Sequence, residues 1–557
     1  MTEPQPDLPE LRKARGAFFT PPEIAEYLAA WAVGGDPNAR VLDPTCGEAV
    51  FLLAAAERLR HMGAPPEALD DRVHGVDLHA ASLAASASML EARGLDAHLI
   101  ADDFFAVSTP AQIGSPLPWM DAVIGNPPFI RYQEFTGASR RRALAAALAQ
   151  GVRLSGLASS WAALLVHSCA FLKPEGRLAM VLPAELLTVG YAEPVRRWLR
   201  SRFQRVNLVL FDDLQFDDAL EKVVLLVASG SGGCDAFNLY EVGDAADLPA
   251  LGPFDGVGVT PADSGKWTDL LLPADQRQLF RRVVAQHFSR LEVYGAPELG
   301  TVTGSNGYFA LTERTREHYG LTEEQLVRIS PPGTKHLRGL SFTRGDWKSM
   351  RDDGERVWLF RPDAADDSQA VADYVAHGES ENVHLAYKCG IRKPWWRPPA
   401  VVPPDLFFTY MSHRYPRLVA NTAGVSYLNS MHGVRLRTDA PDEARQALPL
   451  LTFNSVSMLG AEVFGRSYGG GILKMEPREA AQLPVPNADA MRKAWRLLAP
   501  QRDTLDRQLR DGLWTHVVGR VDEVLLRDVL GLDPHEVDTI WRAAQSLRRR
   551  RIGKDEA

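Results

Sequence analysis

The chain has 557 residues, of which 45% are hydrophobic and 24% are charged, and its formal net charge at pH 7 is −8. These are globular proportions, and the length indicates more than one domain, each able to bury its own core. The negative charge excludes a protein that coats nucleic acid through bulk positive charge, so any such contact must depend on local basic clusters.

The four cysteines, Cys46, Cys169, Cys234 and Cys389, form no CxxC pair, which argues against a zinc site or a disulfide framework and indicates a reducing compartment. Residues 1–11 contain no apolar signal core, and the longest apolar helical stretch, 159–172, is too short to span a bilayer. We therefore expect a soluble, cytoplasmic monomer with no metal site and no membrane partner.

Between residues 40 and 227, short apolar runs alternate with helical stretches, a pattern typical of a doubly wound, largely parallel sheet. Helices are predicted at 50–59 and 80–92. The last two runs have no helix between them, so we expect a terminal hairpin with one antiparallel strand. The predicted strands are 40–42, 73–76, 98–101, 122–124, 178–182, 206–210 and 223–227.

Polar residues follow the first three predicted strands, where open α/β sheets bind their ligands. Asp43 precedes a loop of small residues that lets a ligand approach the backbone, and Asp77 can accept hydrogen bonds from both ribose hydroxyls. Each alone could simply cap a helix, but together at successive strand ends they favour a nucleoside. No G-x-G-x-x-G is present, which weakens a dinucleotide interpretation. The candidates are Asp43, Thr45, Cys46, Gly47, Asp77, Leu78, Asp102, Asp103 and Phe104.

The fourth predicted strand is followed by Asn126, Pro127, Pro128 and Phe129. Two prolines stiffen this loop. The Asn126 side-chain oxygen and the Pro127 carbonyl could accept the two hydrogens of an aromatic amine and so stabilise the positive charge that develops when its nitrogen attacks, while Phe129 offers a flat face for the base. An isolated NPP tripeptide would usually be an ordinary turn, but its place after a buried strand favours catalysis.

In this order, the motifs resemble the gamma class of adenine-specific DNA amino-methyltransferases, which carry a [DNS]-P-P-[FYW] motif. The resemblance covers about residues 15–227 and implies a Rossmann-like methyltransferase core with S-adenosylmethionine as cofactor. It also implies that Thr20, in the segment GAFFTP, contacts the methionine part of the cofactor and that Asp43 lies near its amine, with Asp77 on the ribose.

The same resemblance places Leu78 and Phe104 on either side of the cofactor adenine, with Asp103, or alternatively Asp102, on the adenine amine; Asn126 also borders the cofactor. Phe216 would be the second aromatic on the target base, although read alone it is more simply a core residue. The family's second glycine is replaced by Ala49, which an ordinary right-handed helical conformation would tolerate.

The second half of the chain resembles target-recognition domains of restriction–modification enzymes in the segments LGTVTGSNGYF, RKPWW and SYGGGILK. Basic residues interleaved with tryptophan and tyrosine suit phosphate contacts and groove readout, although each alone could belong to a solvated surface. Arg140 could equally lie on a solvated helix face. The basic run 548–551 could contact DNA or could belong to a soluble tail. The candidate DNA contacts are Arg131, Arg140, Lys335, Arg338, Lys388, Arg392, Lys393 and Lys474.

We therefore predict a methyltransferase domain at 1–235, a linker at 236–290, an α+β target-recognition domain at 291–487 and a helical segment at 488–557. The resemblance implies site-specific transfer of a methyl group to N6 of a flipped adenine in duplex DNA, protecting host DNA from a partner restriction endonuclease. Alternatives are methylation of cytosine N4, an RNA base or a protein glutamine, or a non-catalytic DNA-binding module. No metal-binding D…E-x-K group supports a fused nuclease.

Overall fold

The computed structural model describes residues 20–211, 223–251, 258–260, 266–400, 402–468 and 471–552. The chain divides into two compact units, Met1–Leu270 and Leu271–Ala557, each with its own sheets and core.

The first unit contains one sheet, whose described strands run in the order β3-β2-β1-β4-β5-β7-β6-β8-β9. The pairs from β3 to β5 are parallel. The strands are β1 (Val41–Asp43), β2 (Val73–Asp77), β3 (His98–Ala101), β4 (Met120–Gly125), β5 (Leu172–Pro183), β6 (Arg205–Phe211), β7 (Val223–Ser229), β8 (Phe237–Val242) and β9 (Gly258–Val259).

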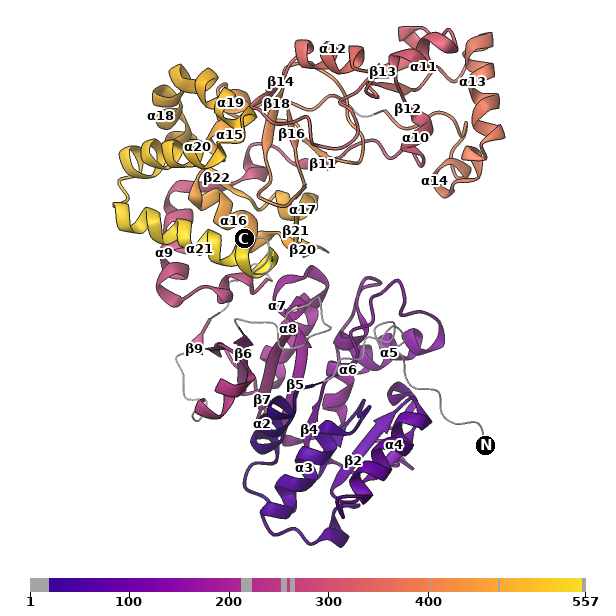
Figure 1. Ribbon diagram of the computed structural model, residues 1–557, viewed down its shortest axis with the longest axis vertical. Coiled ribbons are helices and arrows are strands. Elements are labelled where there is room, and N and C mark those ends of the chain that lie inside the picture. Colours follow the sequence, from indigo (N-terminus) through magenta and orange to yellow (C-terminus); the bar gives the residue numbers. More distant parts are fainter. Residues whose placement is uncertain are drawn as a thin grey trace. The chain divides into compact units, whose positions relative to one another are not determined.

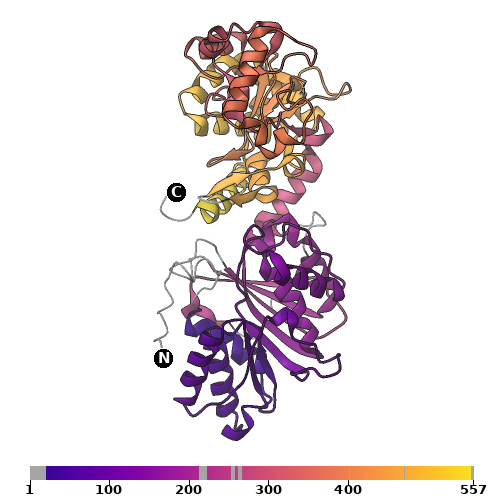
Figure 2. The ribbon, with the colours of Figure 1, turned by 90° about the vertical axis from the view of Figure 1, so that its right-hand side faces the viewer.

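Helices lie on both faces of this sheet (Figures 1 and 2). On one face, α2, α3 and α4 pack on strand residues such as Val41, Ala122, Ile124 and Ala179. Side chains of a strand alternate between the two faces of the sheet, so every second residue contacts the apolar side of a helix. The helices are α2 (Pro22–Val33), α3 (Val50–His61), α4 (Ala80–Glu91), α5 (Gly137–Ala149), α6 (Ser160–Ser168), α7 (Glu185–Thr188) and α8 (Glu193–Arg202).

The predicted doubly wound sheet and its antiparallel strand are confirmed: β7 runs antiparallel to both β5 and β6. The hairpin does not end the sheet, however, because β8 pairs in parallel with β6 and β9 pairs with β8. Much of the segment predicted as a linker, 236–290, is therefore part of the first unit. The prediction missed β8 because its sequence, FNLYEV, is only partly apolar.

The second unit contains a sheet of order β11-β19-β16-β18-β14 and three smaller sheets, β12-β15-β13, β17-β21-β20 and β10-β22. Its strands are β10 (Phe288–Arg290), β11 (Pro297–Leu299), β12 (Ala310–Leu311), β13 (Leu326–Arg328), β14 (Ser341–Phe342), β15 (Trp358–Phe360), β16 (Leu406–Phe408), β17 (Met411–Ser412), β18 (Leu418–Asn421), β19 (His432–Val434), β20 (Arg466–Tyr468), β21 (Ile472–Lys474) and β22 (Pro484–Pro486).

The helices of the second unit are α9 (Ala274–His287), α10 (Asn306–Phe309), α11 (Glu313–His318), α12 (Arg344–Asp352), α13 (Gln369–Ser380), α14 (Tyr387–Gly390), α15 (Ala444–Leu451), α16 (Ser455–Phe464), α17 (Pro477–Ala480), α18 (Ala488–Leu498), α19 (Arg502–Arg510), α20 (Trp514–Val521) and α21 (Pro534–Ile552). A π-helix, Asp522–Val529, continues α20.

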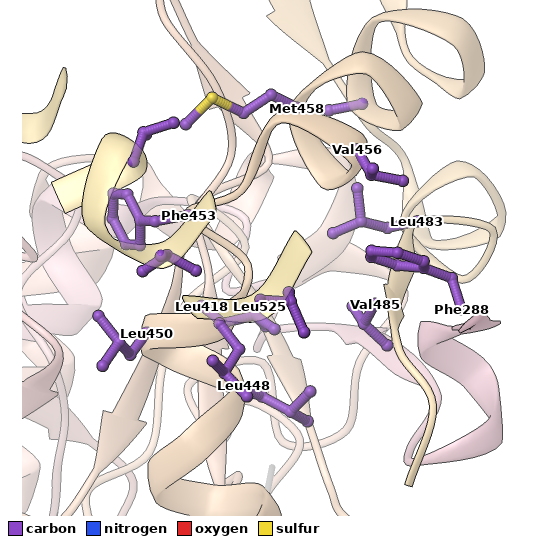
Figure 3. Packing of buried hydrophobic residues seen from close by; sticks show 14 of the residues in the cluster. Phe288, Leu418, Leu448, Leu450, Phe453, Val456, Met458, Leu483, Val485 and Leu525 are labelled. Carbon is purple, nitrogen blue, oxygen red and sulfur yellow. The ribbon is translucent and has the colours of Figure 1, made fainter. Parts of the chain in front are cut away.

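Two cores hold this unit together. One contains buried side chains only from 308–431. The other joins α9 and β10 to α15, α16 and the last helices, so the segment 488–552 is not a separate domain. Figure 3 shows this second core, in which Phe288 and Val485 from the paired strands β10 and β22 lie with Leu448 and Phe453.

The basic run at the end of α21 is partly built into the second unit. Arg551 lies against Glu462 of α16, and their side chains are only 5% and 6% exposed. Arg551 Nε donates to Glu462 Oε2 over 2.9 Å, and a terminal nitrogen donates to Oε1 over 2.8 Å. At this residue, therefore, the run anchors a helix and is not a free tail.

Among the described residues, no single helix is long and apolar enough to cross a bilayer, while α15 and α16 pass that test only as a pair bent by 82°. The same residues contain no group of three or more His, Cys, Asp or Glu side chains placed to hold a metal ion.

Candidate active site

The predicted site residues converge because β1 lies between β2 and β4 in the parallel part of the sheet. Asp43 and Asp77 are the last residues of β1 and β2, and Asn126 directly follows β4. The chain crosses to opposite sides of β1 at this point, which is where doubly wound sheets bind nucleotides. Polar residues far apart in the sequence thus share one edge of the sheet.

The loop after β1 is a cradle of backbone N–H groups and carboxylates. Asp43 is 1% exposed and accepts a hydrogen bond from Thr45 N over 3.1 Å. Asp77 accepts from Gly47 N over 2.9 Å and from His79 N over 2.8 Å, so it joins the loops after β1 and β2. Burial, with a contribution from Asp77, raises the pKa of Asp43 to about 8.

Two features of this loop fit a nucleoside ligand. The Thr45 hydroxyl oxygen is buried and has no hydrogen-bond partner among the described residues. Gly47 has φ +47°, and a side chain there would meet only open space, so a ligand can approach the backbone. Cys46 is 4% exposed, and burial raises its thiol pKa far above the usual range, so it contributes packing rather than nucleophilic chemistry.

The backbone conformation of Ala49 differs from the predicted one. This residue precedes α3 with φ +62° and ψ +18°, the left-handed conformation, and not the right-handed one expected for alanine. This is a backbone conformation that glycine adopts readily, and Ala49 is fully buried. A non-glycine residue pays about 1–2 kcal/mol for this conformation because its Cβ crowds the carbonyl.

Ala49→Gly is therefore expected to raise the free energy of unfolding of the first unit by about 1 kcal/mol. This net value already includes the opposing effect of glycine's greater freedom in the unfolded chain. Urea denaturation measures the change. The matched control is Ala56→Gly, at a fully buried position inside α3, which should instead lower stability. An Ala49→Gly variant that is less stable than wild type would contradict the strain argument.

The residues after β3 differ from expectation in part. Asp103 Oδ1 accepts from Phe105 N over 3.0 Å, and its other oxygen forms an ion pair of 2.6 Å with Arg142 of α5. Phe104 is 4% exposed, with its ring 4.9 Å from those of Phe171 and His167. This burial argues against the predicted contact between Phe104 and a cofactor base.

The remaining residues near the predicted adenine are open to solvent. Asp102 is exposed and accepts a hydrogen bond from Asp103 N over 2.7 Å. Leu78 is 65% exposed, which suits a residue that covers a ligand rather than one that builds the core.

A hydrogen bond orients the side chain of the first residue of the loop 126–130. Asn126 Nδ2 donates to the Thr20 hydroxyl oxygen over 3.2 Å, which orients the side-chain amide. Thr20, which was predicted to contact the cofactor, is 6% exposed, and this hydrogen bond places it beside Asn126. Among the described residues, the backbone hydrogen bonds outside the helices and strands include none to Pro127 O. Phe129 is half-buried against the core of the sheet.

Gly125, which precedes this loop, has φ +151°, and a Cβ there would lie 2.7 Å from Asp43 Oδ1. The ends of β1 and β4 are therefore in direct contact. The prediction did not single out this residue, although a glycine between an apolar run and a polar motif is a signal of a close backbone approach. Phe216, the predicted second aromatic, lies outside the described residues.

Three of the predicted DNA contacts hold other parts of the chain through hydrogen bonds or an ion pair. Arg140 donates to the carbonyls of Tyr132, Phe135 and Gly156, so it joins the loops around α5. Arg392 donates to the carbonyls of Val302, Thr303 and Trp395. Lys474 pairs with Glu476 over 2.8 Å.

Contact of these three residues with DNA stays a prediction, and their internal partners were not foreseen. Sequence shows a positive charge but not the backbone carbonyls or carboxylates that fold around it. The exposed candidates are Arg131, Lys335, Arg338, Lys388 and Lys393.

Comparison with known proteins places this site in a family. The sequence profile of the N-6 DNA Methylase family matches residues 8–202, and that of the C-terminal domain of the type II methyltransferase M.Eco57I matches residues 264–526. The chain thus contains a region, residues 8–202, that matches the N-6 DNA methylases. It is an enzyme that transfers a methyl group to adenine N6 in DNA, with S-adenosylmethionine as the methyl donor.

The chain is 22% identical over 486 residues to the type II methyltransferase M.AccI of Acinetobacter calcoaceticus, and the alignment covers 84% of this chain and 85% of that protein. It is 26% identical over 494 residues to M.XamI of Xanthomonas campestris pv. amaranthicola, covering 85% of each. The type IIL restriction–modification enzyme MmeI in complex with DNA has a similar fold, with a TM-score of 0.57, 12% identity, and coverage of 97% of this chain and 80% of that one.

Proposed function

We propose that this DNA methyltransferase modifies adenine N6 within one specific duplex sequence, as the modification activity of a restriction–modification system, and that residues 126–129 form its catalytic loop. Relatives named as type II methyltransferases, aligned over most of both chains, support the biological role. The observation that carries the catalytic assignment is the Asn126 side chain at the end of β4, oriented by Thr20 beside the buried Asp43.

The chemistry follows from these positions. The adenine amine is a weak nucleophile because its lone pair is delocalised into the ring. Asn126 Oδ1 and Pro127 O accept its two hydrogens, which favours a pyramidal nitrogen and stabilises the developing positive charge. Phe129 stacks on the base after it leaves the duplex, a step that costs on the order of a few kcal/mol. Bound S-adenosylmethionine would supply the methyl group from its sulfonium: the C–N bond forms as the C–S bond breaks, S-adenosylhomocysteine leaves as a neutral thioether, and the methylated amine loses one proton to solvent.

The chain's own residues fit that donor. Asp43 would accept hydrogen bonds from the methionine amine, Asp77 would accept them from the ribose hydroxyls, and Thr45 would offer its buried hydroxyl to a polar group of the ligand. Asp103 would accept from the adenine amine while Arg142 holds its carboxylate in place.

The test uses tritiated S-adenosylmethionine and unmethylated phage DNA with wild type and Asn126→Ala. We expect label in 6-methyladenine with wild type and a loss of about 10²–10³-fold in rate with the variant. The matched control is Asn207→Ala, which removes a buried amide on β6, away from the strand ends. Label in methylcytosine, or full activity of Asn126→Ala, would contradict the proposal. Sequencing that reads modified bases should find methylated adenines in one short sequence.

Cofactor affinity is expected to rise with pH between 6 and 8, by up to roughly tenfold per unit. Asp43, with a pKa of about 8, is protonated in the free enzyme over this range, whereas the bound ammonium favours the carboxylate, so binding releases a proton. Above about pH 8 the gain ends because an α-amino group itself titrates near 7.7–8.0. Calorimetry in buffers of different ionisation enthalpy measures the released proton, and Asp43→Asn should abolish it. Binding without proton release at pH 6.5 would show that Asp43 does not hold the amine.

A further inference from the structure

The first turn of α6 is joined to the catalytic loop by a serine that no motif includes. Ser160, the first residue of α6, is 1% exposed. Its hydroxyl donates to Pro128 O and accepts a hydrogen bond from Ile130 N over 2.9 Å. Its backbone N–H donates to Ile130 O over 3.0 Å. Three hydrogen bonds thus connect one residue to the loop, on both sides of Phe129.

The loop needs such a partner because of its own sequence. Pro127 and Pro128 have no N–H, so neither can donate a hydrogen bond that would fix the loop. The first backbone donor after Phe129 is Ile130 N, and Ser160 accepts from it. A hydroxyl can donate and accept at once, so one small side chain satisfies both a carbonyl and an N–H within a buried site.

These hydrogen bonds fix the direction of the Phe129 side chain. With Pro128 O and Ile130 N both held by one oxygen, the backbone around Phe129 has a fixed orientation, and so has the direction in which its ring leaves the chain. The Thr20–Asn126 hydrogen bond fixes the other end of the loop. Pro127 O lies between these two restraints.

We propose that Ser160 is a positioning residue for methyl transfer, which keeps Phe129 and Pro127 O in the geometry that the target adenine requires. The inference rests on the proposed catalytic role of residues 126–129. Ser160 acts through the loop and touches neither substrate. Its loss should slow the chemical step and leave cofactor binding intact, since most of the proposed cofactor contacts lie at the ends of β1, β2 and β3, and Thr20 and Asn126 are held by their own hydrogen bond.

The test compares Ser160→Ala, Ser160→Thr and Ser168→Ala under single-turnover conditions with tritiated S-adenosylmethionine and phage DNA. Ser168 is the matched control because it is fully buried in the same helix and its hydroxyl donates to Leu164 O over 2.7 Å, within α6. Calorimetry gives the affinity for S-adenosylmethionine and the fraction of binding sites, and each rate is divided by that fraction.

We expect Ser160→Ala to lower the rate per cofactor-binding site by about 10–100-fold, because misplacement of a reacting group by about 1 Å can cost that much. Its cofactor affinity should stay within about twofold of wild type, and Ser168→Ala should keep the wild-type rate. Ser160→Thr retains the hydroxyl and should recover most of the rate. A purely structural role would reduce the fraction of binding sites but not the rate per site.

A Ser160→Ala rate per site within twofold of wild type overturns the inference, and so does a Ser160→Thr variant that binds the cofactor but is as slow as Ser160→Ala. Asn126→Ala, measured in parallel, distinguishes a failure of the inference about Ser160 from a failure of the proposed catalytic loop. If Asn126→Ala is inactive while Ser160→Ala is fully active, only the inference about Ser160 fails. If Asn126→Ala is active, the proposed catalytic loop fails.

Discussion

Arg551→Met is expected to lower the free energy of unfolding of the second unit by about 3–5 kcal/mol. The methionine fills much of the same space, but it leaves the Glu462 carboxylate buried without its cation. Burial already raises the pKa of Glu462 in the wild type, and Arg551 is the main group that offsets this. The variant must therefore either bury a lone charge or protonate it. Urea denaturation followed by tryptophan fluorescence measures the loss.

Two further variants make this test specific. Arg549→Met changes an exposed arginine of the same run and should alter stability by no more than about 0.5 kcal/mol. The double variant Glu462→Met/Arg551→Met removes both charges and should recover most of the stability, because a buried pair can often be replaced by apolar residues. A double variant as unstable as Arg551→Met would show that packing, and not the unpaired charge, causes the loss.

Gly125→Ala is expected to reduce methyl transfer by more than about 100-fold and to weaken cofactor binding. Gly125 has φ +151°, where side chains are strongly disfavoured, and the new Cβ would lie 2.7 Å from Asp43 Oδ1 and 3.3 Å from its Cγ. Asp43 is 1% exposed and cannot turn out to solvent, so β1 and the catalytic loop must separate. Displacements of about 1 Å at a reacting centre cost rate steeply.

Single-turnover rates and calorimetry check this prediction. The matched control is Gly114→Ala, since Gly114 also has a positive φ, +81°, but a side chain there would meet nothing within 4 Å. It should lose about 1–2 kcal/mol of stability and keep its rate. Wild-type activity of Gly125→Ala would mean that the strand ends can separate without disturbing the site.

The parts of this protein that sequence predicts are those with a local signature. The predicted strand 73–76 has valine at both ends and is followed directly by the polar Asp77, so both the strand and the site candidate could be recognised. The convergence of Asp43, Asp77 and Asn126 followed from the general rule that ligands bind at the carboxyl ends of parallel strands, and the sheet order confirms it.

The features that sequence did not predict depend on the surroundings of a residue. Nothing local distinguishes Arg392, which three carbonyls hold, from the exposed Lys393 beside it. The left-handed backbone of Ala49 comes from the loop around it and not from alanine's own preference. Ser160 resembles any serine at the start of an apolar helix, and only the folded chain shows that its hydroxyl reaches a loop 30 residues earlier.

The pairing of β11 with β19 has an evolutionary consequence. Leu299 lies opposite His432, so the two ends of the segment between them lie side by side. This segment contributes to two cores: most of its buried side chains pack among themselves, whereas Leu340, Leu406, Phe408, Leu418 and Ala420 pack into the core that also contains the last helices. The apolar character of these five positions is therefore constrained by the rest of the second unit, while exposed loops between the paired ends tolerate insertion and replacement. Evolution can thus alter the part of the chain proposed to choose the DNA sequence loop by loop, while the strands that enter the shared core keep their apolar residues.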